Sequence, residues 1–406
     1  MQAEGQPRPL RDHRLLRDWA VVAGVMVVMT TGAALWANAV FTGVDAWWVS
    51  SDFWLPVPLA HYVVEGAGPF MYDARSTYLA LPGMPLVLAP AVALTRALGL
   101  TESYPMQIRH PSAYLVLGPY TTLLSTVAVL EARRLATALG VVRRRLALQV
   151  AVTAVPLVAV VTFWGHVEDA LALAGLLAAL RLTAAGEHRR AAIAIGLAVL
   201  FKQWALMGLP IVVFQAPVER RIRTLLEALA LPAAFAVICL AAAFAPTVDA
   251  LLLSPSFPNK GGHRQLWIGS GVRRVPAAPL RALPIVIAAL LGWRARAVAA
   301  PLLLVSAVAV AAATRLLVEP VVHSYYLAPA AALAIVVSFA RHRRGLAPLI
   351  TALLAALAHI MFAVHPSPVV WWSVFVAVLA LMLRDPLVEL GRGLSRATAP
   401  PVPSPR

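Results

Sequence analysis

Apolar runs long enough to cross a lipid bilayer recur along most of the chain, separated by short arginine-rich segments. The first runs from Trp19 to Val40, and about twenty consecutive apolar residues suffice to span a bilayer. The composition agrees, since 61% of the residues are hydrophobic, 13% are charged and the mean hydropathy is +0.79. A water-soluble core of ordinary shape could not bury so much apolar surface. The chain is therefore predicted to be a polytopic membrane protein.

The charge and cysteine content exclude two other classes. The net charge of +16 would suggest a nucleic-acid partner in a soluble protein. Here the arginines cluster in short loops between apolar runs, as the positive-inside rule describes, and no nucleic-acid partner is expected. Cys239 is the only cysteine, so neither an intramolecular disulfide nor a cysteine metal site can form.

The arginine clusters orient the predicted helices. Arginines precede Trp19, so the N-terminus is predicted inside and the loop 41–110 outside. If 78–99 and 111–130 both crossed, the arginines of 133–145 would lie outside, against the rule. Prolines interrupt 78–99, which is therefore predicted not to cross.

A second apolar segment, 191–214, has arginines on both sides. Both of its ends are therefore predicted inside, and the segment is predicted to be a hairpin of two short helices. Its tip, Lys202-Gln203-Trp204, would reach toward the outer face.

With these two segments assigned, the fold class is all-α, with about twelve transmembrane helices and juxtamembrane helices in the outer loop 41–110. The other predicted spans are 19–40, 111–130, 147–163, 168–184, 224–245, 279–292, 298–317, 325–340, 346–363 and 369–383. Residues 1–18 are predicted to be a basic cytoplasmic terminus, 19–391 the transmembrane domain, and 392–406 a disordered cytoplasmic tail.

Polar residues from five distant segments gather on the predicted outer face. Only 18 residues are acidic, yet four of them lie between Asp45 and Asp73 among aromatic residues. The chain has only two lysines, Lys202 and Lys260, and both fall on this face. A compact ammonium suits a phosphate oxygen. The other outer residues of interest are Asp52, His166, Glu168, Asp169, His263, Arg264, Glu319, His323 and Tyr325.

In the order of these features, the chain resembles the GT-C superfamily of integral-membrane glycosyltransferases. Within that superfamily it is similar to bacterial polyprenyl-phosphate-mannose-dependent mannosyltransferases and related uncharacterised transferases. The likeness covers most of the chain from 19 to about 340. It rests on Asp52 followed by Gly66 and Tyr72, on Pro82 to Pro90, on Gly165-His-Val-Glu-Asp169, on Phe201-Lys-Gln-Trp204 followed by Pro210, and on Glu319-Pro through Tyr325-Tyr-Leu-Ala-Pro329.

The resemblance implies a polyprenyl-phosphate-linked sugar donor (mannose or another hexose or pentose), a glycolipid or polysaccharide acceptor and inverting transfer at the outer face of a bacterial plasma membrane. Asp52 would be the general base that accepts the hydroxyl proton, with Asp45 as the alternative. The leaving phosphate needs cationic or hydrogen-bonding partners, for which Lys202, His323, Tyr325 and Arg264 are available. His166, Glu168 and Asp169 would bind the acceptor or a cation. No cofactor is implied, and a divalent cation stays open.

Each of these assignments has a simpler structural or functional alternative. Either aspartate could cap the helix that follows it, and Glu168 and Asp169 could be the solvated start of a span. A transporter or lipid flippase is the main alternative function, and a non-catalytic subunit of an envelope-assembly complex is another. No P-loop occurs, and Gly269-Ser-Gly271 is not a dinucleotide fingerprint.

Overall fold

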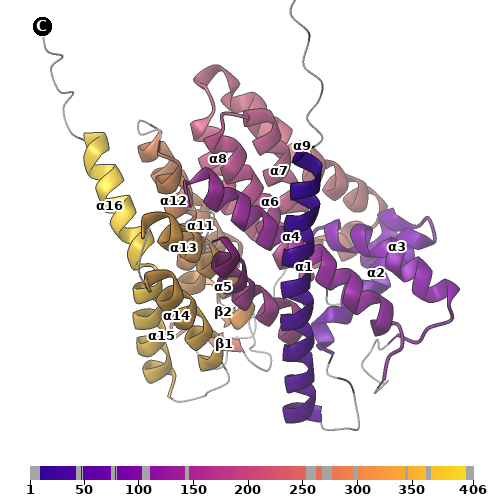
Figure 1. Cartoon of the computed structure of the whole chain (residues 1–406). Coiled ribbons are helices and arrows are strands. Elements are labelled where there is room, and N and C mark those ends of the chain that lie inside the picture. The colour runs from indigo at the N-terminus through magenta and orange to yellow at the C-terminus, as the bar shows by residue number, and fades with distance from the viewer. Residues whose placement is uncertain are drawn as a thin grey trace, which may run out of the picture.

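The protein is described by a computed structural model that is almost entirely helical (Figure 1). The residues that it describes are 10–42, 47, 49–74, 78, 80–102, 110–141, 146–252, 262–267, 277–296, 300–342, 346–362 and 367–398.

The α-helices of the first half are α1 (Leu10–Ala37), α2 (Val57–Val64), α3 (Gly83–Ala97), α4 (Tyr114–Ala138), α5 (Leu146–Val158), α6 (Val167–Ala184), α7 (His188–Phe201) and α8 (Leu209–Gln215). Those of the second half are α9 (Arg221–Ala242), α10 (Phe244–Leu252), α11 (Ala277–Ala295), α12 (Pro301–Val318), α13 (Leu327–Arg341), α14 (Ala347–Met361), α15 (Pro368–Met382) and α16 (Arg384–Thr398).

Short 3₁₀ and π turns connect several of these helices. They are η1 (Asn38–Thr42), η2 (Ser51–Trp54), η3 (Gly68–Asp73), η5 (Ala159–Trp164), η6 (Gln203–Gly208), η7 (Val218–Arg220) and η8 (Ser324–Tyr326). The strands β1 (Gly262–Arg264) and β2 (Val321–His323) pair antiparallel, with Gly262 opposite His323 and Arg264 opposite Val321.

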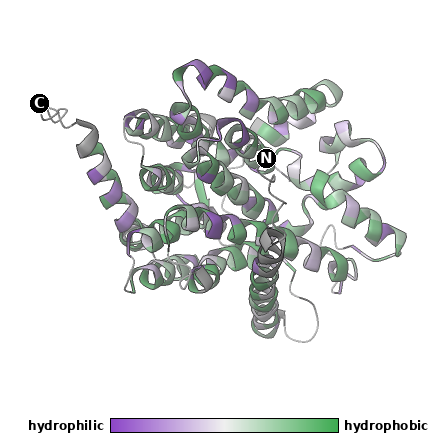
Figure 2. Ribbon diagram, turned by 45° about the horizontal axis from the view of Figure 1, so that its top comes forward, coloured by the Kyte–Doolittle hydropathy of each residue, from purple (hydrophilic) through white to green (hydrophobic). Residues whose placement is uncertain are grey.

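Several helices have the length and apolar character of membrane spans. Helical backbone satisfies its own hydrogen bonds, which is what a chain in lipid requires. Figure 2 shows hydrophobic residues along most helices. Within the described residues, five helical segments are long and apolar enough to cross a bilayer: Asp18–Val40, Tyr114–Ala138, Val218–Ala242, Pro301–Val318 and Ser324–Arg341. Shorter apolar helices accompany them, so the chain is an all-α membrane protein, whereas the number of twelve crossings stays a prediction.

The segment predicted not to cross forms α3. At 15 residues and 1.5 Å per residue, α3 is about 22 Å long, which is less than the ~30 Å hydrocarbon core of a bilayer. It packs against α2 at one side of the bundle (Figure 1).

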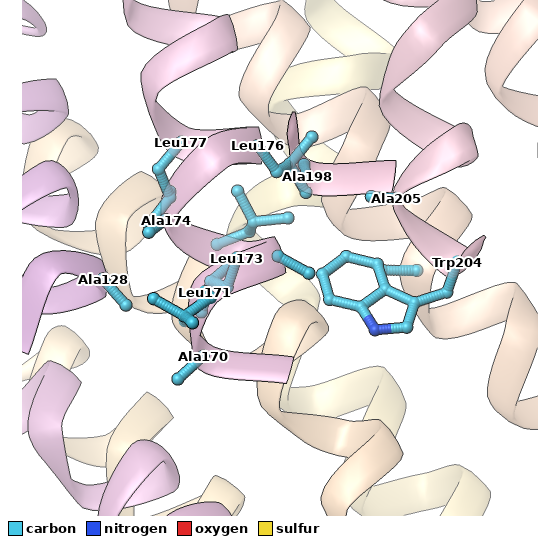
Figure 3. Close-up of a cluster of buried hydrophobic side chains, with 14 of the residues drawn as sticks. Ala128, Ala170, Leu171, Leu173, Ala174, Leu176, Leu177, Ala198, Trp204 and Ala205 are labelled. Carbon is cyan, nitrogen blue, oxygen red and sulfur yellow. The ribbon is translucent and has the colours of Figure 1, made fainter. Parts of the chain in front are cut away.

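Helix α6 lies at the centre of the bundle, between α4 and α7, and is buried along nearly its whole length. Small side chains allow the close packing that Figure 3 shows around Ala174 and Ala198. A Cβ atom on Gly175 would lie 2.8 Å from the Cβ of Ala198, so α6 and α7 approach more closely than larger residues would permit. This packing holds α6 in one position and therefore fixes the side chains at its ends.

Ion pairs join one end of α1 to the ends of α4 and α6. Asp18 accepts from Arg133 at 2.8 Å, and Glu131 accepts from Arg181 at 3.0 Å. Asp18 is near the start of α1, whereas the other three residues lie in the later turns of α4 and α6. The first turn of α6 is therefore at the opposite end of the bundle from these pairs.

The C-terminal segment differs from the prediction. A disordered tail was predicted over 392–406, but α16 continues as a helix to Thr398, and 399–406 lie outside the described residues. Its mixed apolar and polar sequence packs against α12 and α13, and a Cβ atom on Gly393 would lie 2.6 Å from Cδ1 of Leu303. This tertiary contact outweighs the polar composition of the segment.

Candidate functional site

A chain of hydrogen-bonded charged side chains lies at the first turn of α6. His166, the residue before α6, is buried, and its Nδ1 atom lies 2.8 Å from Oε1 of Glu168. Its Nε2 atom lies 3.1 Å from Oδ2 of Asp52, which belongs to η2. Because each ring nitrogen faces a carboxylate, the imidazole donates from both nitrogens and is protonated. A histidine thus joins the expected base to a buried glutamate.

The chain continues to the break between α7 and η6. The backbone at Lys202 is extended, which ends α7 at Phe201. The ammonium donates to Oε1 of Glu168 at 2.8 Å and lies 3.5 Å from Oδ2 of Asp169. Trp204 donates from Nε1 to Oδ1 of Asp169 at 2.6 Å. The ammonium that we expected to bind a phosphate is therefore bound to two carboxylates.

A close backbone approach brings Asp52 to His166. Gly165 has φ +70°, and a Cβ atom there would lie 2.5 Å from the backbone nitrogen of Phe53. Only glycine fits both the left-handed conformation and this contact. Ser50 donates from Oγ to the carbonyl oxygen of Trp164 at 2.8 Å and fixes η2 against the end of η5. The local sequence around Gly165 thus positions the carboxylate of Asp52.

Asp52 is the member of the chain with the most access to solvent. Its side chain is 32% exposed, against 3% for Glu168 and 1% for Asp169. Oδ2 faces His166, and Oδ1 accepts a hydrogen bond from the Ser51 hydroxyl at 3.2 Å. Asp52 is therefore the carboxylate that an incoming molecule can reach.

Opposite charges keep Asp52 and His166 ionised at neutral pH. Burial by itself would raise the pKa of Asp52, but the hydrogen bond and positive charge of His166 outweigh burial and lower it. Burial also works against the charged imidazole, yet the negative charge of Glu168 and hydrogen bonds to both carboxylates raise the pKa of His166 to about 9. The pair is a carboxylate and an imidazolium.

Aromatic side chains cover the imidazolium. The ring of Tyr325 lies 3.9 Å from that of His166, and His323 stacks on Tyr325 at 5.4 Å between centroids. Trp164 meets His323 edge-on at 6.0 Å. Burial and the nearby charge of His166 lower the pKa of His323 to about 4, so His323 is neutral. These rings shield the ion pairs from water and strengthen them.

The structure brings seven of the nine predicted site residues to one place. They are Asp52, His166, Glu168, Asp169, Lys202, His323 and Tyr325. Asp45 lies outside the described residues, as does Lys260. Arg264 lies on β1 opposite Val321, and its carbonyl oxygen accepts from Nε1 of Trp372 at 3.0 Å.

The residues that support the site were not predicted from the sequence. Trp204 was placed at the hairpin tip but given no function, although it binds Asp169. Gly165 belongs to a motif that we noted, yet its role depends on Phe53, more than one hundred positions away. The sequence did contain one indication of the hydrogen bonds of η2. Ser50 and Ser51 directly precede Asp52, and serine hydroxyls often bond to nearby groups in this way.

A cation could be held by the same side chains. Ligand atoms of His166, Glu168 and Asp169 all lie within 4.8 Å of one another, and all three residues are buried. Histidine and carboxylate ligands suit Zn²⁺. However, Lys202 already supplies a positive charge to both carboxylates. A metal would have to displace the ammonium.

An apolar groove is lined in part by η5, the π turn that ends at Trp164. It has a volume of about 350 Å³ and lies between α1, α5 with η5, and α14, lined by residues that include Met29, Val158, Phe163 and Ile360. Phe163 directly precedes Trp164, which is part of the aromatic cover of the site. The groove is a suitable surface for a hydrocarbon chain.

Comparison of the chain with protein-family models, with curated proteins and with solved structures finds no match.

Proposed function

We propose that the protein is a membrane glycosyltransferase that moves a sugar from a polyprenyl-phosphate-linked donor to a cell-envelope glycolipid or polysaccharide. The observation that carries the proposal is the partly exposed Asp52 carboxylate, held ionised by the buried His166 imidazolium. Removing a proton from a sugar hydroxyl requires such an acceptor. The likeness to the GT-C superfamily supplies the donor class.

In the proposed reaction, an acceptor hydroxyl oxygen attacks the anomeric carbon of the donor sugar. The new carbon–oxygen bond forms as the bond to the phosphate oxygen breaks, and the hydroxyl proton passes to Asp52. Polyprenyl phosphate leaves with the bonding electron pair, and the configuration at the anomeric carbon inverts. The His166 imidazolium orients the carboxylate and keeps it ionised before the proton arrives.

The apolar groove supports a lipid-linked donor. Phe163 of the groove lining directly precedes Trp164 of the aromatic cover, and we propose that an isoprenoid chain in the groove extends its polar head toward Asp52. Of the helices that line the groove, α1 is long and apolar enough to cross a bilayer, and α5 with η5 and α14 are shorter apolar helices. The active site is proposed to lie on the outer face, as the arginine distribution predicts.

The decisive experiment measures sugar transfer by the purified protein in liposomes that contain a polyprenyl-phosphate sugar. Asp52→Asn keeps the volume but removes the proton acceptor, so the rate is expected to fall by about 10²-fold or more. Asp73→Asn is the matched control, since Asp73 is an exposed acid in the same loop. Equal rates for wild type and Asp52→Asn would overturn the proposed base.

The buried charges also suit a transporter or flippase, which is the alternative function. Ionisable groups inside membrane proteins are commonly parts of transport pathways. Mass spectrometry of the liposome lipids separates the two functions. A transferase creates a new glycosidic bond, whereas a transporter moves the donor across the bilayer unchanged. Comparing envelope glycolipids of cells with and without the protein then identifies the acceptor.

A further inference from the structure

Two arginines share one buried glutamate next to the site. Glu319, at the end of α12, is buried, and its Oε1 accepts from Nε of Arg281 at 2.8 Å and from Nη2 of the same residue. Nε of Arg315 lies 3.5 Å from Oε2 of Glu319. Two guanidinium groups against one carboxylate leave one positive charge in excess.

This arginine pair is joined to the charged chain through two tyrosines. The guanidinium carbon of Arg315 lies 4.0 Å from the ring centroid of Tyr326. Tyr326 packs edge-on against Tyr325 at 4.6 Å, and Tyr325 covers the imidazolium of His166. The positive cluster and the acidic cluster therefore lie on either side of a tyrosine pair.

One buried donor of Arg315 lacks an acceptor within the described part of the chain. Nη1 of Arg315 is buried and has no acceptor among the residues that the structure describes. Its side chain is 12% exposed, whereas that of Arg281 is 40% exposed. A buried charged donor without an acceptor is costly, and an oxyanion would supply the missing acceptor. Arg281 provides the accessible side of such a site.

The two clusters have opposite net charge. Around His166, the carboxylates of Asp52, Glu168 and Asp169 outnumber the imidazolium and the ammonium of Lys202 by one. A phosphate would be repelled by this cluster, and the ammonium is already engaged by two carboxylates. The arginine pair is the neighbouring site with charge of the right sign.

We propose that Arg281 and Arg315 bind the phosphate of the donor lipid, in place of the Lys202 contact expected from the sequence. The identity of the ligand rests on the proposed function, whereas anion binding itself rests on the arginine pair. The guanidinium groups stabilise the negative charge that develops on the phosphate oxygen as its bond to the sugar breaks. Asp52 takes the proton at the other cluster.

The test measures binding of farnesyl phosphate to the purified protein in a neutral detergent, with inorganic phosphate and phosphatidylglycerol as separate probes. We expect Arg281→Gln and Arg315→Gln each to weaken farnesyl phosphate binding by about tenfold or more. Arg96→Gln is the matched control, because Arg96 lies on α3 in an exposed pair with Glu65. Asp52→Asn is expected to leave the affinity undiminished.

Glu319→Gln keeps the proposal falsifiable if an arginine variant does not fold. It removes the internal competitor for both guanidinium groups, so farnesyl phosphate should bind more tightly. Unchanged or weaker binding by a folded Glu319→Gln protein would overturn the anion site. Equal affinity for phosphatidylglycerol and farnesyl phosphate would assign the arginines to membrane lipid and overturn the donor assignment.

Failure of this proposal is distinguishable from failure of the proposed function. Sugar transfer by wild type, with unchanged donor affinity in both arginine variants, would reject the phosphate site and retain the transferase. Arginine-dependent binding of farnesyl phosphate without any transfer by wild type would retain the anion site and reject the transferase.

Discussion

The Nε2 atom of His166 lies 3.1 Å from Oδ2 of Asp52, although the two residues are 114 positions apart in the sequence. Asp52 belongs to the loop after α1 and His166 to the turn before α6. The contact joins a partly exposed carboxylate to a buried ionic chain that ends at Lys202. A candidate base is thus held in one orientation and one charge state by residues from three separate segments.

Stability should depend on pH through His166. Its pKa is raised from 6.5 to about 9, so the stabilisation is fully present below pH 6.5 and is lost as the pH rises through about 9. A pKa shift of this size corresponds to about 3 kcal/mol in the free energy of unfolding. The difference in thermal unfolding temperature between wild type and His166→Gln should therefore shrink from pH 6.5 to 9.5. A difference that stays constant over this range, with exposed His110→Gln as control, would contradict the ion pair.

The Asp52 carboxylate should remain ionised to unusually acidic pH. Because its pKa is lowered, the stabilisation that it provides is present above its ordinary pKa and is lost only as the pH falls through the lowered value. In His166→Gln the carboxylate loses its cation while remaining partly buried. The acid limb of the pH–rate profile should then move to higher pH in this variant. An unmoved acid limb would mean that another group controls the rate.

Gly165→Ala should separate Asp52 from His166. The new Cβ atom would collide with the backbone of Phe53, in addition to the strain of a positive φ. We expect loss of most transfer activity, measured per correctly folded molecule. Gly186→Ala is the control, because Gly186 also has a positive φ (+75°) but no atom within 4 Å of the added carbon. Similar activity losses in the two variants would implicate backbone strain alone.

Lys202 and Glu168 should be energetically coupled. Lys202→Met leaves two buried carboxylates without their ammonium, and breaking a buried pair in this way typically costs about 3–5 kcal/mol. Glu168→Gln in the same protein should recover part of that loss, since one of the stranded charges is gone. A double-mutant cycle on the free energy of unfolding measures the coupling. Additive effects of the two substitutions would show that the pair does not interact.

The membrane orientation predicts which residues a reagent can reach from outside. In a Cys239→Ala background, Leu98→Cys at the end of α3 should react with an impermeant maleimide in intact cells. Ala185→Cys, in the turn after α6, should react only after permeabilisation. Both side chains are exposed in the structure. Labelling in the reverse order would invert the proposed topology and the outward-facing site.

The sequence by itself determined the class of fold. Long apolar runs have no soluble alternative, because their backbone and side chains require lipid or a fully buried position. Local signals also predicted the break at Lys202, because arginines flank the apolar run 191–214 on both sides. They failed at the C-terminus, where the packing of α16 outweighs a polar composition that suggests disorder.

The tertiary structure decided which partner each charge has. Residue type suggested that Lys202 would bind a phosphate, but an ammonium binds the nearest uncompensated carboxylate, and the packing of α6 against α7 places Glu168 2.8 Å away. In the same way, the sequence did not indicate a partner for Glu319, and the fold places Arg281 and Arg315 beside it. Electrostatic energy depends on distance and burial, and neither is encoded in the identity or spacing of distant residues.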